Sequence, residues 1–171
     1  LEKAVRNIER DLGHELPNGY RSEALMQLPY WIQAVAGGLG RGAMLFVDYG
    51  YVRREYYQAD RDQGTIRAFY RHQVHNDVFA WPGLQDITAS VDFTAMAEAG
   101  TGAGFELAGY TNQASFLLGN GVDQALLEAE SRTDEVGQVA LREQLKRLTL
   151  PSEMGERFGV IGFQREVDFE P

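Results

Sequence analysis

The chain has 171 residues, of which 44% are hydrophobic and 24% charged, so it is long enough for one globular domain with a hydrophobic core. It contains no Cys, which excludes disulfides, cysteine nucleophiles and thiolate metal sites. The formal net charge of −9 argues against general binding to nucleic acid. No apolar run approaches the roughly 18 residues that a membrane-spanning helix needs, so we expect no membrane partner.

Apolar residues at helical spacing predict two helices in the N-terminal part of the chain. The first covers residues 2–12, and the turn Pro17-Asn18-Gly19 follows it. The second covers residues 24–39, and Pro29 must either begin its regular part or kink it. One face of the second helix is expected to carry its apolar residues, which are Leu25, Leu28, Ile32, Val35 and Leu39.

The run AMLFV, residues 43–47, predicts a strand that is buried on both faces, because it shows no polar alternation. Such strands belong to parallel sheets that are flanked by helices. The glycine-rich segment GGLGRG, residues 37–42, comes directly before this strand. In dinucleotide and S-adenosylmethionine folds the glycines follow the strand and lead into a helix. We therefore interpret residues 37–42 as the end of a helix, and not as a cofactor loop.

The rest of the chain predicts an alternation of short strands and helices. Residues 51–63 and 76–90 are expected to be loops, with a short strand over 64–71 between them. A helix is expected over 93–99, between Asp92 and Gly100, and a strand over 105–110. The C-terminal part is expected to contain a helical stretch over 113–130 broken at Gly119-Asn120-Gly121, a helix over 134–148 and a last strand within 154–163. This order predicts an α/β layered domain whose sheet is small for a self-standing open sheet.

The strongest candidate site is Asp48-Tyr49-Gly50, which follows the predicted buried strand. In open α/β sheets, ligands bind outside the carboxyl ends of the strands. A carboxylate at that position can accept hydrogen bonds from a substrate or act as a base. The alternative is that Asp48 caps the next turn and that Gly50 supplies a positive φ.

A second candidate lies in the segment QDITASVDF, residues 85–93. Asp92 is explained as the cap of the following helix, whereas Asp86 has no such local explanation. Asp86 and Asp48 together could form an acidic pocket for a cation such as guanidinium, which two carboxylates hold in a fixed fork. The alternative is that Asp86 and Thr88 only close a turn.

A third pattern, His72, His75 and Asp77, resembles a metal-binding sequence. Pairs of His ligands on a helix are better placed four residues apart, and this segment is not predicted to be helical. We expect no metal here and interpret His72 as a polar loop residue near a substrate pocket. A metal-dependent hydrolase that uses these three residues stays open as a minor alternative.

Seven blocks of the sequence together resemble one family, the MidA-like class I S-adenosylmethionine-dependent methyltransferases. The blocks are LPNGYRSE (16–23), LFVDYGY (45–51), EYY (55–57), FYRHQVHNDVF (69–79), PGLQDITASVDFTAMAEAG (82–100), TNQASFLLGNG (111–121) and LPSEMGERFGVI (150–161). They occur in the order that is found in the family and cover most of the chain. The mitochondrial member of this family is a protein arginine methyltransferase that assists the assembly of respiratory complex I.

The resemblance implies a fold, a cofactor and an activity. Residues 1–171 would be the C-terminal half of a Rossmann-like methyltransferase sheet with flanking helices, without the N-terminal half that carries the glycine-rich cofactor loop. The cofactor would be S-adenosylmethionine, and the substrate would be a protein, methylated at arginine. The protein would be cytoplasmic in a bacterium or lie in the mitochondrial matrix of a eukaryote, and a homodimer is left open.

The resemblance also implies roles for single residues. Asp48 and Asp86 would be catalytic, because carboxylates orient and polarise a guanidinium that must lose a proton. Tyr49, Gly50, Thr88 and His72 would line the substrate pocket. The main alternative is a non-catalytic interaction or assembly module on the same fold, which the missing glycine loop favours.

Overall fold

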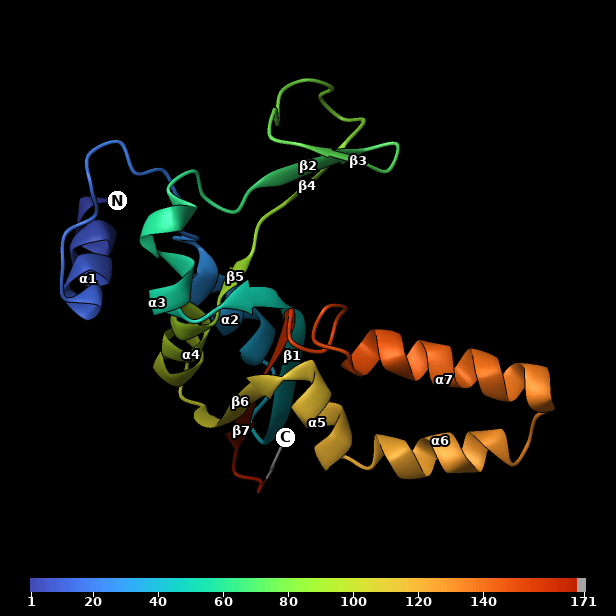
Figure 1. Ribbon diagram of the computed structural model, residues 1–171. Helices are drawn as coiled ribbons and strands as arrows, with labels where there is room; N and C mark the ends of the chain where they lie inside the picture. The colour runs from blue at the N-terminus through green and yellow to red at the C-terminus, as the bar shows by residue number, and fades with distance from the viewer. Residues whose placement is uncertain (169–171) are drawn as a thin grey trace.

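A computed structural model of the chain describes residues 1–168, coloured along the sequence in Figure 1. The elements in chain order are α1 (Glu2–Leu12), α2 (Leu28–Ala36), β1 (Gly42–Tyr51), α3 (Arg53–Tyr56), a 3-10 turn (Ala59–Arg61), β2 (Arg67–Tyr70), β3 (Gln73–His75), β4 (Asp86–Thr88), β5 (Val91–Asp92), α4 (Phe93–Gly102), β6 (Glu106–Asn112), α5 (Gln113–Gly119), α6 (Val122–Glu130), α7 (Glu135–Thr149) and β7 (Phe158–Arg165). The predicted alternation of helices and strands is confirmed. The short helix α3 and the strand β4 lie in segments that we expected to be loops.

The main sheet has four strands in the order β5-β1-β7-β6. β1 pairs antiparallel with β7 from Gly42–Arg165 to Tyr49–Phe158, and it pairs parallel with β5 only at Gly50 and Tyr51. β7 also pairs antiparallel with β6. The sheet is therefore mixed, which corrects the expectation that β1 belongs to a purely parallel sheet.

Helices α2 and α4 pack on one face of this sheet and form the main core. α2 begins at Leu28 with Pro29 in its first turn, where the missing proline N–H is not needed. Its buried side chains are Leu28, Ile32 and Ala36, four residues apart. Leu25 precedes the helix and is 65% exposed, and Val35 lies within the helix but outside its buried face and is 48% exposed. The core is completed by residues from α4 and the strands, which are Met44, Phe93, Met96, Ala99, Phe105, Ile161 and Phe163.

The second face of β1 is not covered within residues 1–168. Met44 is buried, but Leu45 and Val47 are exposed at 41% and 46%, since alternate side chains of a strand point to opposite faces. From Gly42 to Tyr49, the edge of β1 away from β7 has no strand partner within the described residues. The expectation that β1 is buried on both faces is therefore wrong for this part of the chain.

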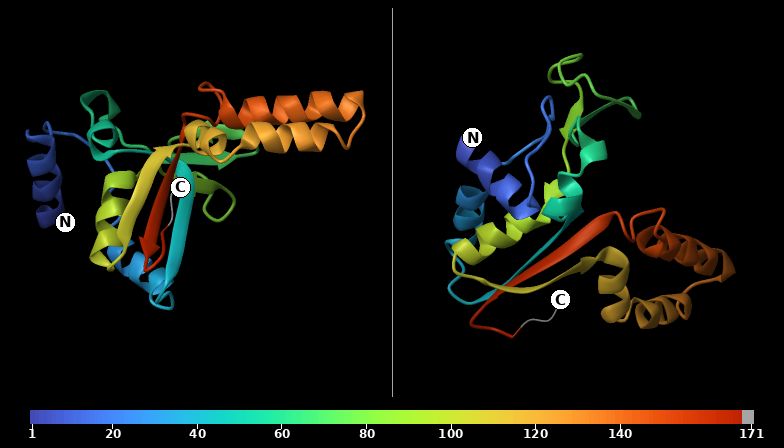
Figure 2. Two further views of the ribbon diagram at one scale, coloured as in Figure 1. Left: turned by 90° about the horizontal axis from the view of Figure 1, so that it is seen from below. Right: turned by 60° about the vertical axis from the view of Figure 1, so that its left-hand side comes forward.

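Two projections leave the main body in different directions (Figures 1 and 2). The first, the arm sheet, comprises residues 67–88, whose strands pair antiparallel in the order β3-β2-β4. The second is the pair α6–α7, in which no residue of either helix is buried. The sequence placed the break before α6 correctly, and Gly121 adopts the left-handed φ of 76° there.

The predicted end of the helix after Asp92 is wrong, because Gly100 is needed for packing and does not end the helix. Helix α4 does not stop at Gly100 but continues to Gly102. A Cβ atom at position 100 would lie 2.2 Å from the ring of Phe163, so the glycine lets helix and strand approach closely. Gly100 is thus required by the packing of α4 against the sheet.

Candidate functional site

The first candidate region is the carboxyl end of β1, where Asp48 and Tyr49 lie. The Asp48 side chain is exposed, accepts a 2.8 Å hydrogen bond from the backbone N–H of Tyr49, and has no ion pair within residues 1–168. The Tyr49 ring contacts Phe158 edge-on, with 5.9 Å between the ring centroids. Asp48 is therefore free to accept hydrogen bonds from a ligand.

Gly50, the third residue of this block, has a structural reason to be glycine. A Cβ atom at this position would lie 2.2 Å from the carbonyl oxygen of Val91 and 2.9 Å from the ring of Phe93. Its φ is not in the left-handed region, so the expected positive φ is not the reason. Gly50 allows β5 and α4 to pack directly against the end of β1, while its role at a substrate pocket stays a prediction.

The second candidate region is a hollow of about 420 Å³ on the arm sheet, lined by Phe69, Arg71, His72, Asp86 and Thr88. The strand register explains this grouping, because Phe69 pairs with Asp86 across β2 and β4. Three residues that the sequence singled out, His72, Asp86 and Thr88, are thus brought together. The sequence did not point to Phe69, which lies in β2, or to Arg71, which follows in the turn with a φ of 49°.

The structure does not place all predicted residues around one hollow. Asp86 lines the hollow on the arm sheet, whereas Asp48, Tyr49 and Gly50 belong to the main sheet and do not line it. The joint acidic pocket of Asp48 and Asp86 stays a prediction. Asp48 lies in β1 and Asp86 in β4, and the chain between them runs through α3 and into the arm. The hydrogen bonds that hold this stretch of chain therefore affect how the two residues are placed.

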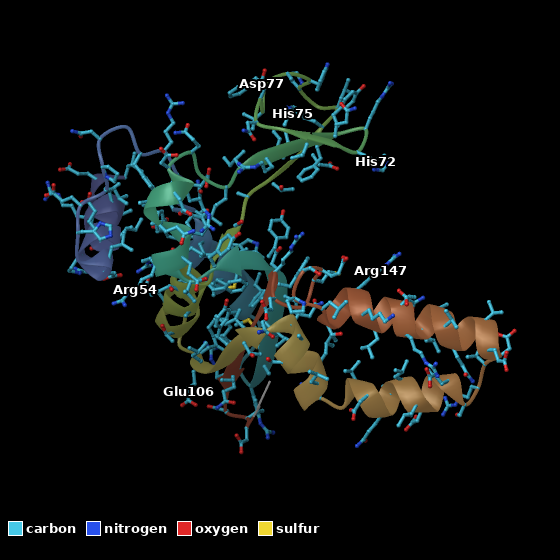
Figure 3. The ribbon with its side chains drawn as sticks, in the orientation of Figure 1. Arg54, His72, His75, Asp77, Glu106 and Arg147 are labelled. Atoms are coloured by element: carbon cyan, nitrogen blue, oxygen red, sulfur yellow. The ribbon has the colours of Figure 1, made fainter. Side chains whose placement is uncertain are left out.

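The metal pattern is not assembled within the described part of the chain. No group of three or more His, Asp or Glu side chains there could hold a metal ion. Figure 3 shows His72 at the tip of the β2–β3 turn and away from His75 and Asp77. The His75 ring instead packs edge-on against Trp81 at 5.2 Å, and Asp77 accepts a 3.0 Å hydrogen bond from the N–H of Phe79. This geometry speaks against the hydrolase alternative.

A buried arginine, which the sequence did not point to, holds the loop after β1. Arg53 is 7% exposed and donates to the carboxylates of Asp11, Asp92 and Glu98, with 2.6 Å and 2.7 Å to the Glu98 oxygens. Asp92 also caps α4 as predicted, by accepting a 3.0 Å hydrogen bond from the N–H of Ala95. Burial raises the pKa of Asp92, and the Ala95 N–H and Arg53 oppose this rise. The cluster ties α1, α3 and α4 together.

A second carboxylate, Glu23, fixes the base of the arm. It accepts hydrogen bonds from the N–H and Oγ1 of Thr65, at 2.9 Å and 3.0 Å, and from the N–H of Ile66 at 3.2 Å. The hydroxyl of Tyr57 donates to the backbone carbonyl of Glu23 at 3.0 Å. These bonds attach the segment that enters β2 to the main body.

The tyrosines after β1 are anchors and do not frame an open pocket. Tyr56 and Tyr57 are 3% and 4% exposed and pack with Ile8 of α1. Burial raises the pKa of the Tyr56 hydroxyl to about 12 and also raises the pKa of Tyr57. Both phenols are therefore neutral at physiological pH and act as hydrogen-bond donors within the structure.

Residues 1–168 do not by themselves form a glycine loop of the kind that holds a nucleotide. The loop from Gly37 to Gly42 follows α2 and enters β1, as the sequence indicated. The glycines around Gly104, which has a φ of 85°, follow α4 and precede β6. Neither segment leads from a strand into a helix, so the described residues do not offer the backbone cradle that such cofactors need.

Residues 1–111 match the family described as "Putative S-adenosyl-L-methionine-dependent methyltransferase". The chain belongs to this family. The resemblance seen in the sequence blocks is thereby confirmed.

Named relatives of the chain are mitochondrial proteins of vertebrates. "Protein arginine methyltransferase NDUFAF7, mitochondrial" of Rattus norvegicus is 38% identical over 121 residues, which cover 68% of this chain and 25% of that protein. The protein of the same name from Homo sapiens is 35% identical over 121 residues. The chain thus spans about a quarter of the length of the curated relatives it matches.

Two solved structures from Burkholderia thailandensis are similar to the chain. One, bound to S-adenosyl-homocysteine, is 40% identical with a TM-score of 0.87 over 99% of this chain and 43% of that chain. The other is 43% identical with a TM-score of 0.84 over 90% of this chain and 41% of that chain. They confirm the predicted α/β fold class, a methyltransferase sheet with flanking helices.

No helix within residues 1–168 has the length and apolar character that are needed to cross a membrane.

Proposed function

We propose that the protein containing this chain is an S-adenosylmethionine-dependent methyltransferase that methylates an arginine of a protein substrate. The main support is the similarity over 99% of the chain to a structure that was solved with S-adenosyl-homocysteine, the product left when the methyl group has been transferred. The names of the vertebrate relatives support arginine in a protein as the acceptor.

In this proposal the cofactor is held outside residues 1–171, and the chain is the C-terminal half of the methyltransferase domain. The absence of a strand–glycine–helix segment from residues 1–168 supports this division. The free edge of β1 and the exposed Leu45 and Val47 support it as well, because a further strand and helix layer would cover them. β1 would then lie inside a larger sheet, as its uninterrupted apolar run predicts.

The chain itself would supply the acceptor side of the site. Asp48 at the end of β1 and Asp86 in the hollow would accept hydrogen bonds from the guanidinium of the substrate and so orient its nitrogen. One of the two carboxylates would accept the proton that the nitrogen loses when it takes the methyl group from the sulfonium. His72 and Thr88 would line the substrate path beside Asp86, and Tyr49 and Gly50 would do so beside Asp48. Methyl transfer needs little else from the protein beyond alignment of the reacting atoms.

The experiment compares Asp48→Asn and Asp86→Asn with the wild type in the full protein. Incorporation of a radiolabelled methyl group into protein is measured and the modified residue is identified after hydrolysis. Each variant is expected to lower the rate about 100-fold, since positioned acid–base groups contribute about that much. Asp77→Asn is the matched control, because Asp77 lies on the same arm and outside the hollow.

Wild-type transfer by both variants would remove the assignment of these two carboxylates. The alternative, an interaction or assembly module without catalysis, is tested separately by calorimetry with S-adenosyl-homocysteine. If the full protein does not bind this compound, the module is favoured.

The cellular location and the oligomeric state follow only as part of the proposal. We propose the cytoplasm for a bacterial protein and the mitochondrial matrix for a eukaryotic one, in line with the mitochondrial names of the vertebrate relatives. A homodimer stays a prediction, which sedimentation of the full protein tests.

A further inference from the structure

Two arginines of the arm, Arg67 in β2 and Arg71 in the turn after it, have charges that are not paired within residues 1–168. Arg67 donates only to the neighbouring carbonyl of Ile66 at 2.7 Å, and the Arg71 guanidinium lies 5.3 Å from the ring centre of Tyr70. Neither has a carboxylate within salt-bridge distance in the part of the chain that the structure describes, in contrast to Arg53 with its three carboxylates. The segment from residue 63 to 76 contains both arginines and no acidic residue, in a chain of net charge −9. Residues 63–76 are therefore a basic segment of an acidic protein, while Asp77 and Asp86 lie in the rest of the arm.

The two faces of the arm sheet differ. The arm's own loop covers part of one face, where Ala68 is fully buried and Trp81 stacks on Tyr70 with 4.6 Å between the ring centroids, while Ile87 beside Ala68 is 56% exposed. The other face carries Phe69, which is 42% exposed beside its cross-strand partner Val74 at 60%. The hollow of about 420 Å³ opens beside Phe69 on this face.

Spacing along the strand defines what this face can bind. Arg67 and Phe69 are two residues apart in β2 and so share a face, and Arg71, in the turn after β2, lines the same hollow as Phe69. The two arginines are up to about 13 Å apart along an extended backbone. An extended peptide with two carboxylates four residues apart and an apolar side chain midway has the matching pattern. Guanidinium groups bind carboxylates in a bidentate fork, which favours acidic over basic peptides.

We propose that the Phe69 face of the arm sheet, with Arg67 and Arg71, is a docking surface for an extended acidic segment of the protein substrate. This inference rests on the proposed function, because it identifies the segment as part of the methylated protein. The segment lies along β2 with its carboxylates on the two arginines and its apolar residue on Phe69. Asp86, at the β4 side of the hollow, repels an acidic side chain there and so fixes the position of the segment.

The test is a fluorescence anisotropy titration of the full protein with the labelled peptide TETVTET, in which both Glu and the central Val lie on one face of an extended chain. We expect TETVTET to bind more tightly than TKTVTKT, in which Lys replaces Glu, and than TEETVTT, in which the carboxylates are adjacent. Arg67→Ala and Arg71→Ala should each weaken binding about threefold to tenfold. Arg71→Lys should retain part of the affinity, because it keeps the charge and loses the fork.

Arg147→Ala is the matched control, since Arg147 is an exposed arginine on the other projection, α7, and has no salt bridge within residues 1–168 (Figure 3). It should leave the affinity unchanged. Circular dichroism checks that each arm variant is folded.

Equal binding of all three peptides, no binding of TETVTET, or an equal loss with Arg147→Ala would each overturn the proposal. Because the titration contains no cofactor, such a failure is distinct from a failure of the methyltransferase proposal. Cofactor binding by calorimetry together with absent peptide binding would overturn the docking surface alone.

Discussion

At the residue scale, two neighbouring arginines after β1 have different surroundings. Arg53 is buried among three carboxylates, whereas its neighbour Arg54 is exposed (Figure 3). Nothing in the local sequence distinguishes the two arginines. The difference arises because Asp11 and Asp92 come from distant parts of the chain and converge on one of them. The buried arginine is therefore a structural residue and the exposed one is not.

We predict that Arg53→Met lowers the free energy of unfolding by about 3 kcal/mol, because it leaves Asp92 buried without its cation. Urea unfolding at neutral pH measures this, with Arg54→Met as the control. Without Arg53, burial raises the pKa of Asp92 further above its unfolded value. A raised folded pKa adds stability that is fully present below the unfolded pKa and lost as the pH rises through the folded pKa, so the deficit should shrink as the pH falls from neutral and be smallest below about pH 4. An Arg53 variant as stable as the Arg54 variant would contradict this prediction.

At the element scale, the end of β1 is where strands, helix and loop meet. Gly50 lets β5 pair at Val91 and lets Phe93 of α4 pack against the strand. On the same side of β7, Gly159 leaves room for the rings of Phe93 and Tyr110. Gly50 and Gly159 thus both leave space for the ring of Phe93. This contact orients the strand end that carries Asp48.

We predict that Gly50→Ala lowers the free energy of unfolding by about 3 kcal/mol, because the added methyl group collides with the Val91 carbonyl. Gly38→Ala is the matched control, since no atom lies within 4 Å of its Cβ position, and it should change stability by less than about 0.5 kcal/mol. Thermal unfolding distinguishes the two variants. If both melt at the same temperature, the close approach at Gly50 is not needed.

At the scale of the whole molecule, β1 is a central strand without a neighbour along most of one edge. Its exposed Leu45 and Val47 lie beside backbone groups that no strand within residues 1–168 pairs with. An apolar edge of this kind favours association with another strand. In the full protein we propose that the cofactor-binding segment covers it.

We predict opposite effects of Val47→Lys in two settings. In the isolated chain of residues 1–171, the lysine should reduce self-association, measured by sedimentation velocity, because a charge discourages edge-to-edge pairing. In the full protein it should weaken binding of S-adenosyl-homocysteine by destabilising the covered sheet. Val136→Lys on α7, where the valine is 78% exposed, should do neither. Normal cofactor binding by the Val47 variant would contradict the proposal that the cofactor-binding segment covers this edge of β1.

Much of the fold could be predicted from the sequence, because local patterns carry it. The periodicity of residues 2–12, the break at Gly119-Asn120-Gly121 and the cap at Asp92 all depend on neighbouring residues, and the structure confirms each of them. The position of the glycines before β1 likewise showed that they do not form a cofactor loop. For the site, the sequence blocks pointed to Asp86, Thr88 and His72, which the hollow brings together.

The tertiary structure alone decided the rest, because the deciding contacts join residues far apart in the chain. The direction of β1 in a mixed sheet depends on β7, and the burial of Arg53 depends on α1 and α4. The apolar run of β1 predicted two covered faces, yet α2 and α4 cover only one within residues 1–168. Local sequence patterns thus determined which helices and strands form. Long-range packing determined how the strands pair and which faces the helices cover, and it left the arginines beside Phe69 without carboxylate partners within residues 1–168.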